Sequence, residues 1–246
     1  MASVLVIGAT SAIAGAVLGR LAARGDRLYL VARDEERLAA LVESLGPAVV
    51  GAEARDLVRL DEPGELVARA VAALGQLDVA WICHGWLPDQ RTTEQDPAVA
   101  AEALQVNLLS VIALLLPLAN HMEAQAHGTL AVITSVAGMR GRPRNYTYGA
   151  AKAGLSTYLR GLRSRLWPVG VRVVDLRPGP VITPMTEGHP RNLLFTTPEA
   201  IAPAIVAALD RGPPVVFLPW FWGPLMAIIT RLPEPVFQRL GVLAGR

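Results

Sequence analysis

The sequence predicts an α/β fold in which helices flank a central parallel sheet of about seven strands, in a doubly wound arrangement. Short β-branched runs alternate with longer stretches rich in Ala, Leu and Arg, which is typical of repeated strand-helix units. The chain has 246 residues, of which 52% are hydrophobic, and this suffices for one large core. No internal repeat or Gly/Ser linker marks a boundary, so we expect a single domain over residues 1–246.

The predicted strands lie where β-branched residues cluster. In chain order they cover residues 4–7, 27–31, 49–52, 79–82, 129–134, 172–176 and 215–218. The first helix is expected over residues 12–23, because Gly25 offers a residue that can turn the chain beyond its end. Asp34 is a suitable N-cap for a second helix, which runs to about Leu45 before a Gly-Pro pair stops it.

Composition excludes several classes of function. The formal net charge is +2 and no dense run of Lys and Arg is present, so we expect no DNA or RNA partner. A single cysteine, Cys83, cannot form an internal disulfide or by itself a zinc site, so we expect a reducing compartment and no metal centre. The N-terminus has neither a basic region nor a cleavage site, which favours the cytoplasm. Residues 107–122 are almost uncharged but shorter than the ~20 apolar residues of a membrane span, so we expect a buried helix.

The junction of the first strand and the first helix has the composition of a dinucleotide site. Small residues there let the backbone approach a pyrophosphate at the N-terminus of a helix, as in a Rossmann-type fold. The candidate contacts are Gly8, Thr10, Ser11, Ala12 and Ile13. Ala12 and Ala14 are expected to have negative φ, because a methyl group is poorly tolerated in a left-handed turn. A strand-helix turn with a structural role only is the alternative.

Arg33 ends the second strand, beside the position that an adenosine ribose takes in dinucleotide folds. An arginine there favours the 2'-phosphate, whereas an acid favours the 2'-hydroxyl. Arg33 therefore predicts NADP(H), and NAD(H) is possible because Asp34 follows directly.

Four polar residues farther along the chain have the spacing of an acid-base site. Tyr148 and Lys152 are four residues apart, one helical turn, so the ammonium is expected to lower the pKa of the phenol from its usual ~10. A phenol tuned in this way can act as a general acid or base. Ser135 ends a predicted strand thirteen residues before Tyr148, within reach of a folded loop, and would hold the substrate oxygen. Asn107, if buried in its helix, could bind a water that relays protons to Lys152.

Asn107, Ser135 and Tyr148-x-x-x-Lys152, in this order, resemble the catalytic tetrad of the short-chain dehydrogenase/reductase family over essentially the whole chain. The resemblance implies hydride transfer between NADP(H) and a carbonyl or secondary alcohol, with Tyr148 as general acid or base and Lys152 on the ribose hydroxyls. It also implies further cofactor contacts, which are Asp56 and Leu57 near the adenine, Gly85 after the fourth strand, and Pro178, Gly179, Val181 and Thr183 around the nicotinamide. For Asp56 the alternative is a loop aspartate without a role in binding.

Two stretches depart from that family. Its usual Gly-x-x-x-Gly-x-Gly turn has Ala12 and Ala14 in place of the later glycines, and its Asn-Asn-Ala-Gly segment reads Ile-Cys-His-Gly, ending at Gly85. His84 is either a proton-transfer group or a histidine satisfied by nearby backbone. Cys83 fits a small buried residue better than a nucleophile.

Two features bear on the substrate. The loop between Ser135 and Tyr148 carries three arginines on alternate positions, Arg140, Arg142 and Arg144, which could bind a phosphate or could be solvated and paired with acids. The hydrophobic C-terminal segment, residues 217–246, contains an aromatic-rich stretch over 220–229. That stretch could lie at a membrane surface, line a lipid-accepting pocket, or pack in the core or an oligomer interface.

Together with the Ser135-Val-Ala-Gly and Arg177-Pro-Gly segments, these features resemble the decaprenylphosphoryl 2-keto-ribose 2-reductases. The resemblance implies reduction of a polyprenyl-phospho-2-keto-pentose, a flavin oxidase partner, and contact with the inner face of the membrane. The alternatives are a reductase or dehydrogenase of a fatty or steroid-like alcohol, a dinucleotide-binding regulator, and a scaffolding subunit. Members of the broader family commonly pair through the helices that hold Asn107 and Tyr148, so a homodimer or homotetramer is expected.

Overall fold

A computed structural model describes residues 1–58, 63–188 and 191–240. Within them, one parallel sheet has the strand order β3-β2-β1-β4-β5-β6-β7. The strands are β1 (Ser3–Ile7), β2 (Arg27–Ala32), β3 (Val49–Ala54), β4 (Val79–Ile82), β5 (Thr129–Ile133), β6 (Arg172–Pro178) and β7 (Val215–Leu218). The predicted α/β class is confirmed, with seven strands in this sheet. The order reverses between β1 and β4, which is the switch point where ligands bind in open α/β sheets.

Strand boundaries differ slightly from the prediction. β3 extends two residues farther, because Glu53 and Ala54 pair with Val31 and Ala32 of β2 although Glu53 is polar. β5 ends one residue early at Ile133, and Thr134 follows it outside the strand.

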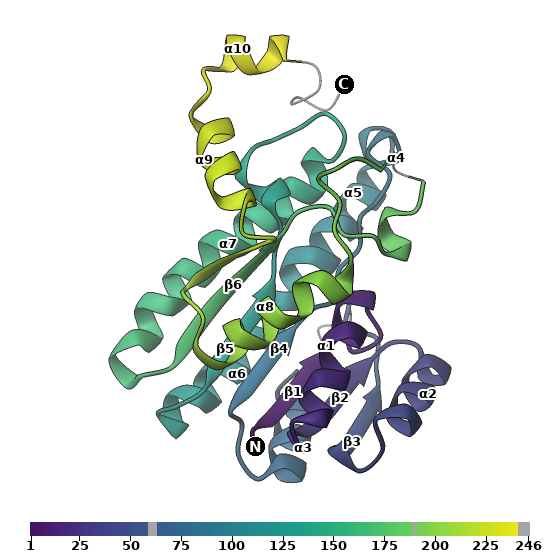
Figure 1. Ribbon diagram of the computed structural model, residues 1–246, viewed down its shortest axis with the longest axis vertical. Coiled ribbons are helices and arrows are strands. Elements are labelled where there is room, and N and C mark those ends of the chain that lie inside the picture. The colour runs from purple at the N-terminus through teal and green to yellow at the C-terminus, as the bar shows by residue number, and fades with distance from the viewer. Residues whose placement is uncertain (59–62, 189–190, 241–246) are drawn as a thin grey trace.

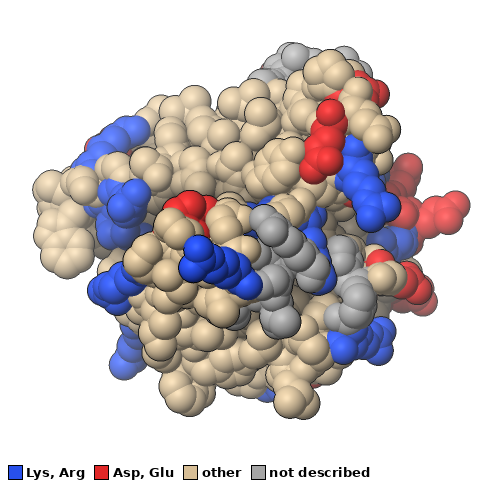
Figure 2. All heavy atoms as spheres, turned by 90° about the horizontal axis from the view of Figure 1, so that it is seen from above, with Lys and Arg blue, Asp and Glu red and all other residues tan. Residues whose placement is uncertain are grey.

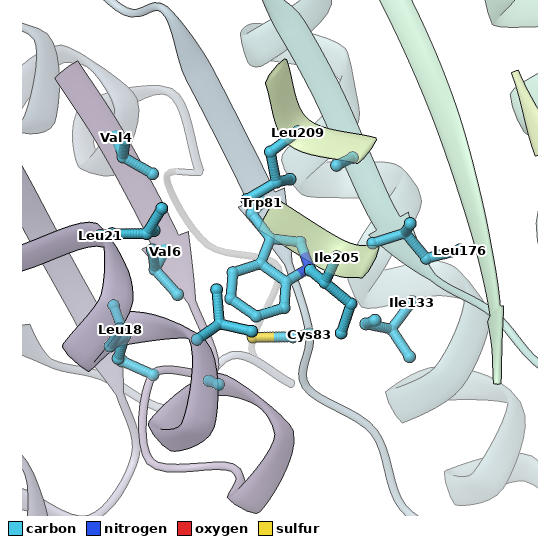
Figure 3. Packing of buried hydrophobic residues seen from close by; sticks show 14 of the residues in the cluster. Val4, Val6, Leu18, Leu21, Trp81, Cys83, Ile133, Leu176, Ile205 and Leu209 are labelled. Atoms are coloured by element: carbon cyan, nitrogen blue, oxygen red, sulfur yellow. The ribbon is translucent and has the colours of Figure 1, made fainter. Parts of the chain in front are cut away.

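Helices cover both faces of the sheet (Figure 1). One face carries α1 (Ala12–Ala23), α2 (Glu35–Leu45) and α8 (Pro198–Arg211), and the other carries α3 (Pro63–Leu74), α6 (Ser110–Gln125) and α7 (Tyr146–Leu166). Each face has its own apolar core. In the first core the fully buried Trp81 lies between the side chains of α1 and those of α8 (Figure 3). The sheet is therefore buried on both sides, as parallel sheets usually are.

The predicted starts of the first two helices have a visible cause. The Ser11 hydroxyl accepts the Ala14 N–H at 3.1 Å and caps α1, and the Asp34 carboxylate accepts the Arg37 N–H at 3.0 Å and caps α2. Gly25, just beyond α1, has a φ of +84°, the left-handed conformation expected of it.

The apolar stretch over residues 107–122 is only partly buried. A π-helical turn over Gln105–Leu109 joins α5 (Pro97–Leu104) to α6. The helical run Pro97–Gln125 is long and apolar enough to cross a membrane by length and composition, and 33% of its most apolar window is buried. One side packs on the sheet, whereas Leu109 and Leu116 are 46% and 48% exposed. The prediction of a buried helix was thus right for one face and wrong for the other, because hydropathy alone does not tell which apolar face meets the sheet.

The C-terminal part of the chain lies at one end of the molecule. There α9 (Trp222–Arg231) and α10 (Glu234–Arg239) extend beyond the sheet at the end opposite the N-terminus (Figure 1). Residues 241–246 of the hydrophobic segment lie outside the described residues. Among the described residues, the face at this end shows Lys and Arg side chains scattered over largely uncharged surface, with Asp and Glu side chains among them (Figure 2).

Candidate active site

A cavity of about 790 Å³ opens beyond the carboxyl ends of the strands, at the switch point of the sheet. Its walls bring together residues from the N-terminal turn, the end of β2, and the segments after β4, β5 and β6. The predicted cofactor contacts on its walls are Gly8, Thr10, Ser11, Ala12, Ile13, Arg33, Asp56, Leu57, Gly85, Pro178, Gly179, Val181 and Thr183. Ser135, Tyr148 and Lys152 line the same cavity.

The N-terminal turn has the geometry of a close backbone approach. Gly8 has a φ of +91°, and a Cβ placed on it would lie 2.5 Å from the backbone nitrogen of His84. Ala12 and Ala14 lie inside α1 and have no positive φ, as predicted. Glycine is therefore required at the first position of the turn and dispensable at the two later ones.

We expect Gly8→Ala to lower the free energy of unfolding by about 2–4 kcal/mol, because the methyl group adds both a left-handed strain and a collision with backbone. Urea titration would measure the change. Gly15→Ala is the matched control, because nothing lies within 4 Å of its Cβ position in α1, and it should be slightly stabilising. Equal unfolding midpoints for Gly8→Ala and wild type would show that the close approach is wrong.

Two arginines stand where the cavity meets the end of β2 and the start of α2. Arg33 is exposed on the cavity wall, and Arg37, which the sequence reading missed, lies beside it and donates to the Thr10 carbonyl at 2.8 Å. The carboxylate of Asp34 accepts the Arg37 N–H as the helix cap. Arg37 could have been found from the predicted N-cap at Asp34, since the cap places Arg37 in the first turn of the helix that follows Arg33.

Asn107 lies in the middle of the π-helical turn and is fully buried. Its amide donates to the carbonyls of Trp86 at 2.7 Å and Ala103 at 2.9 Å, and its oxygen accepts the Trp86 N–H at 3.0 Å. A Cβ on Gly85 would lie 3.0 Å from that oxygen and 3.5 Å from Lys152 Nζ, so the asparagine stands next to the lysine. The Asn107 amide therefore hydrogen-bonds backbone groups. The predicted water relay from Asn107 to Lys152 stays a prediction.

Ser135, Tyr148 and Lys152 converge as predicted from their spacing. Lys152 is 1% exposed, and its ammonium donates to the Ile133 carbonyl at 3.1 Å and lies 5.6 Å from the centroid of the Tyr148 ring. The Ser135 hydroxyl accepts the Ala137 N–H at 3.0 Å and also hydrogen-bonds the Tyr148 side chain. A phenol, a hydroxyl and an ammonium therefore share one wall of the cavity.

The pKa values differ from the expectation. Burial raises the pKa of Tyr148 to about 12, and the hydrogen bond with Ser135 only partly offsets it. Burial also lowers the pKa of Lys152 to about 8, although the nearby Asp175 carboxylate acts in the opposite direction. The predicted lowering of the phenol pKa by the ammonium was wrong, because the spacing of the two groups can be read from the sequence but their desolvation cannot.

A buried carboxylate supports this wall from β6. Asp175 is fully buried and accepts two hydrogen bonds from Arg177, from Nε at 2.8 Å and from Nη2 at 2.6 Å. It also accepts a short hydrogen bond from the Thr134 hydroxyl. Thr134 stands between Ile133, which binds Lys152, and Ser135, so the carboxylate fixes the segment that presents both catalytic candidates.

Cys83 and His84, which depart from the family pattern, are a buried and a partly buried residue, and both are neutral near pH 7. The Cys83 thiol lies 3.2 Å from the Ile7 carbonyl, and burial raises its pKa to about 12, as expected of a structural cysteine. His84 Nε2 lies 2.9 Å from Ser110 Oγ, while Nδ1 is buried without a partner, and burial lowers the pKa of the ring to about 3. In the described part of the chain, no three His, Cys, Asp or Glu side chains gather where they could hold a metal ion.

The three loop arginines divide into different roles. Arg140 does not line the cavity, because it donates to the carbonyls of Ile229 and Leu232 at 2.7 Å each and pairs with Glu234 at 2.8 Å. Its guanidinium also lies 4.0 Å from the centroid of the Phe237 ring. Of the two alternatives left open by the sequence, Arg140 fits the one in which a loop arginine pairs with an acid, and its polar atoms hold the C-terminal helices against the loop. Arg142 and Arg144 do line the cavity.

The C-terminal segment supplies part of the cavity wall, next to the segment after β6. Trp222, Met226 and Ile229 of α9 are buried in a small cluster with Val136 and Phe237. Trp222, Leu225 and Ile229 line the cavity. From the sequence, lining a pocket was one of several alternatives for this stretch. Trp220 and Ile228 are 78% and 63% exposed, so the segment is also partly open to its surroundings.

Known proteins similar to this chain were found by family model and by sequence. The family model described as short chain dehydrogenase matches residues 2–193. An uncharacterized oxidoreductase of Mycobacterium tuberculosis is 38% identical over 242 residues, covering 97% of each chain. Another, from Streptomyces coelicolor, is 38% identical over 246 residues, covering 98% of this chain and 96% of the relative.

Solved structures share the fold. A short chain dehydrogenase from Burkholderia cenocepacia in complex with NADP matches with a TM-score of 0.84 at 22% identity, over 97% of both chains. The family match covers most of the chain, and two relatives extend over nearly its whole length. The chain therefore belongs to the short-chain dehydrogenase/reductase family of oxidoreductases.

Proposed function

We propose that the protein interconverts a carbonyl group and a secondary alcohol with NADP(H), through Tyr148, Ser135 and Lys152. The observation that carries the proposal is the convergence of these three side chains on the cavity that begins at the Gly8 turn. Family membership favours an enzyme over the regulatory and scaffolding alternatives considered from the sequence.

The residues of the cavity fit a nicotinamide dinucleotide. The turn at Gly8 has no room for a Cβ, and the N-terminal amides of α1 would face a pyrophosphate. Asp56, Leu57 and Gly85 would border the adenosine half. Pro178, Gly179, Val181 and Thr183 would border the nicotinamide. NADPH, when bound, supplies the hydride.

The remaining chemistry falls to the protein's own side chains. A phenol whose pKa is raised to about 12 is protonated at neutral pH, so Tyr148 is ready to donate its proton to an alkoxide, which favours reduction. The Ser135 hydroxyl would hold the substrate oxygen, and Lys152 would bind ribose hydroxyls and stabilise negative charge on the phenol. Asn107 holds the Trp86 backbone beside Lys152. The direct test is NADPH oxidation with a panel of ketones, where no turnover of any ketone would count against the proposal.

Preference for NADP(H) over NAD(H) rests on Arg33 and Arg37, because Asp34 is committed to capping α2. We expect Arg33→Ala to raise KM for NADPH by about 10-fold or more, the cost of losing a charge-assisted hydrogen bond, with KM for NADH nearly unchanged. Steady-state kinetics with both cofactors would measure this. Arg20→Ala, on the exposed face of α1 and outside the cavity, is the matched control. Equal losses with both cofactors would argue against a 2'-phosphate contact.

The substrate is proposed to be lipophilic, since Trp86, Leu87, Leu225 and Ile229 line the cavity. A polyprenyl-phospho-2-keto-pentose is the first candidate, because Arg142 and Arg144 stand on the same walls, and a flavin oxidase would then be the partner that supplies it. A fatty or steroid-like alcohol or ketone is the second candidate, favoured by the apolar lining alone.

The exposed apolar side chains are the basis for two further proposals, one on oligomeric state and one on location in the cell. The exposed side chains Leu104, Leu109 and Leu116 lie along the helices that also carry Asn107, which favours a homodimer or homotetramer through this face. A cytoplasmic enzyme with peripheral contact at the inner face of the membrane would use the exposed Trp220 and Ile228. Light scattering and vesicle sedimentation would test the two proposals separately.

A further inference from the structure

We propose that the wall formed by α9 and the arginine loop is an anion-binding subsite for the substrate. In it, the Arg142 guanidinium and the Trp222 indole N–H recognise a carboxylate or phosphate attached to an apolar body. This inference rests on the proposed function and specifies the substrate class of that site.

Arg142 carries polar atoms that the described protein does not satisfy. Its Nε is buried without a hydrogen-bond partner, and its Nη2 lies 3.4 Å from the thioether sulfur of Met226, a weak acceptor. Burial lowers the pKa of the guanidinium, and no carboxylate in the described part of the chain opposes this effect. A partly buried cation without a counter-charge is costly, and an anion entering the cavity would remove that cost.

Arg140, two residues earlier in the same loop, shows the contrast. Its guanidinium has two backbone carbonyls, the Glu234 carboxylate and the Phe237 ring as partners. The loop thus holds one arginine whose polar atoms are paired with the C-terminal helices and another that lines the cavity and has a buried Nε without a partner.

Trp222 provides a second unpaired donor on the same wall. It is 3% exposed, and its Nε1 is buried without a partner. A Cβ on Gly179 would lie only 2.0 Å from this nitrogen, so the indole edge rests against the segment assigned to the nicotinamide. Trp222 and Met226 are one helical turn apart on α9, and Met226 contacts Arg142, so the indole and the guanidinium lie along the same face of that helix.

The neighbours of the two donors limit the ligand further. Leu225 and Ile229 line the cavity from the same helix, and Val136 and Phe237 pack behind it. In such surroundings a charge-assisted hydrogen bond is stronger than in water. A neutral ketone would leave both donors unpaired, whereas a carboxylate or phosphate with an apolar chain would satisfy the donors and fill the cavity.

Matched substrates test this directly. Straight-chain methyl ketones ending in a carboxylate, a monophosphate or a methyl ester would be compared by NADPH oxidation with wild type, Arg142→Met, Arg142→Lys and Trp222→Phe. We expect kcat/KM for an anionic ketone to exceed that for the ester by about 10- to 100-fold in wild type. The ratio should fall to within about 2-fold in Arg142→Met, be partly kept in Arg142→Lys, and fall by about 10-fold in Trp222→Phe.

The control is Arg231→Met, an exposed arginine on α9 that lies outside the cavity and should keep the full preference. The relative kcat/KM of the wild-type enzyme for the carboxylate and the phosphate ketone shows which of the two anionic groups the subsite binds better. Equal turnover of anions and ester by wild type, or a preference that survives in Arg142→Met, would overturn the inference.

A binding measurement separates this inference from the proposed function. Decanoate and decyl phosphate, which contain no ketone, would be titrated calorimetrically into Tyr148→Phe and into the same protein with Arg142→Met. Binding that depends on Arg142 supports the subsite even if no ketone is reduced. Ketone reduction without binding of either alkyl anion would overturn the subsite and leave the catalytic proposal standing.

Discussion

Replacing Tyr148 with phenylalanine is expected to lower kcat for carbonyl reduction by about 10²- to 10⁴-fold, the usual contribution of a positioned general acid. The change removes one hydroxyl, and the ring can keep its place near Lys152, so folding and NADPH binding should be nearly unaffected. Turnover would be followed by NADPH absorbance, and cofactor affinity by fluorescence titration.

Tyr146→Phe is the matched control for this loss. Tyr146 lies two residues earlier on α7 and is 46% exposed, outside the cavity walls. The control should retain wild-type kcat. If both variants kept full activity, the proton would have to come from another group, and the assignment of Tyr148 would be wrong.

Replacing Asp175 with alanine should cost about 3–5 kcal/mol of folding free energy, the range for breaking a buried ion pair by removing one partner. The substitution leaves the Arg177 guanidinium, 14% exposed, and the Thr134 hydroxyl without their shared acceptor. Urea unfolding would measure the loss. Asp210→Ala breaks an exposed pair with Arg24 and should cost at most about 1 kcal/mol.

The conservative variant Asp175→Asn should also shift the pH profile. The carboxylate raises the pKa of Lys152 against the larger effect of burial, so its removal moves that pKa below about 8. Lys152 would then lose its proton at lower pH, and the alkaline limb of kcat/KM should move to lower pH. An unchanged limb would mean that the carboxylate acts on stability alone.

Local features of the fold could be predicted from the sequence because their causes are local. The cap at Asp34 and the turn at Gly8 each depend on a few neighbouring residues. The wall shared by Tyr148 and Lys152 follows from helical spacing. These features and the sheet they serve were confirmed with shifts of one or two residues at strand ends.

Long-range contacts could not be predicted. Nothing in the sequence distinguishes the role of Arg140 from that of Arg142. Carbonyls at the end of α9, about ninety residues away, bind Arg140, whereas Arg142 contacts Met226 and lines the cavity. Desolvation is likewise a property of the packed molecule, so the raised pKa of Tyr148 could not be deduced from the four-residue spacing to Lys152. The role of Trp222 depends on its direct contact with Gly179, which is more than forty residues earlier in the chain.

The most direct test of the central claim is transfer of deuterium from NADPH labelled at C4 to the product of a ketone that the protein reduces. Mass spectrometry should find the label on the carbinol carbon with wild type, with little product formed by Tyr148→Phe under the same conditions. NADPH binding without label in any alcohol product would contradict carbonyl reduction as the function of this site.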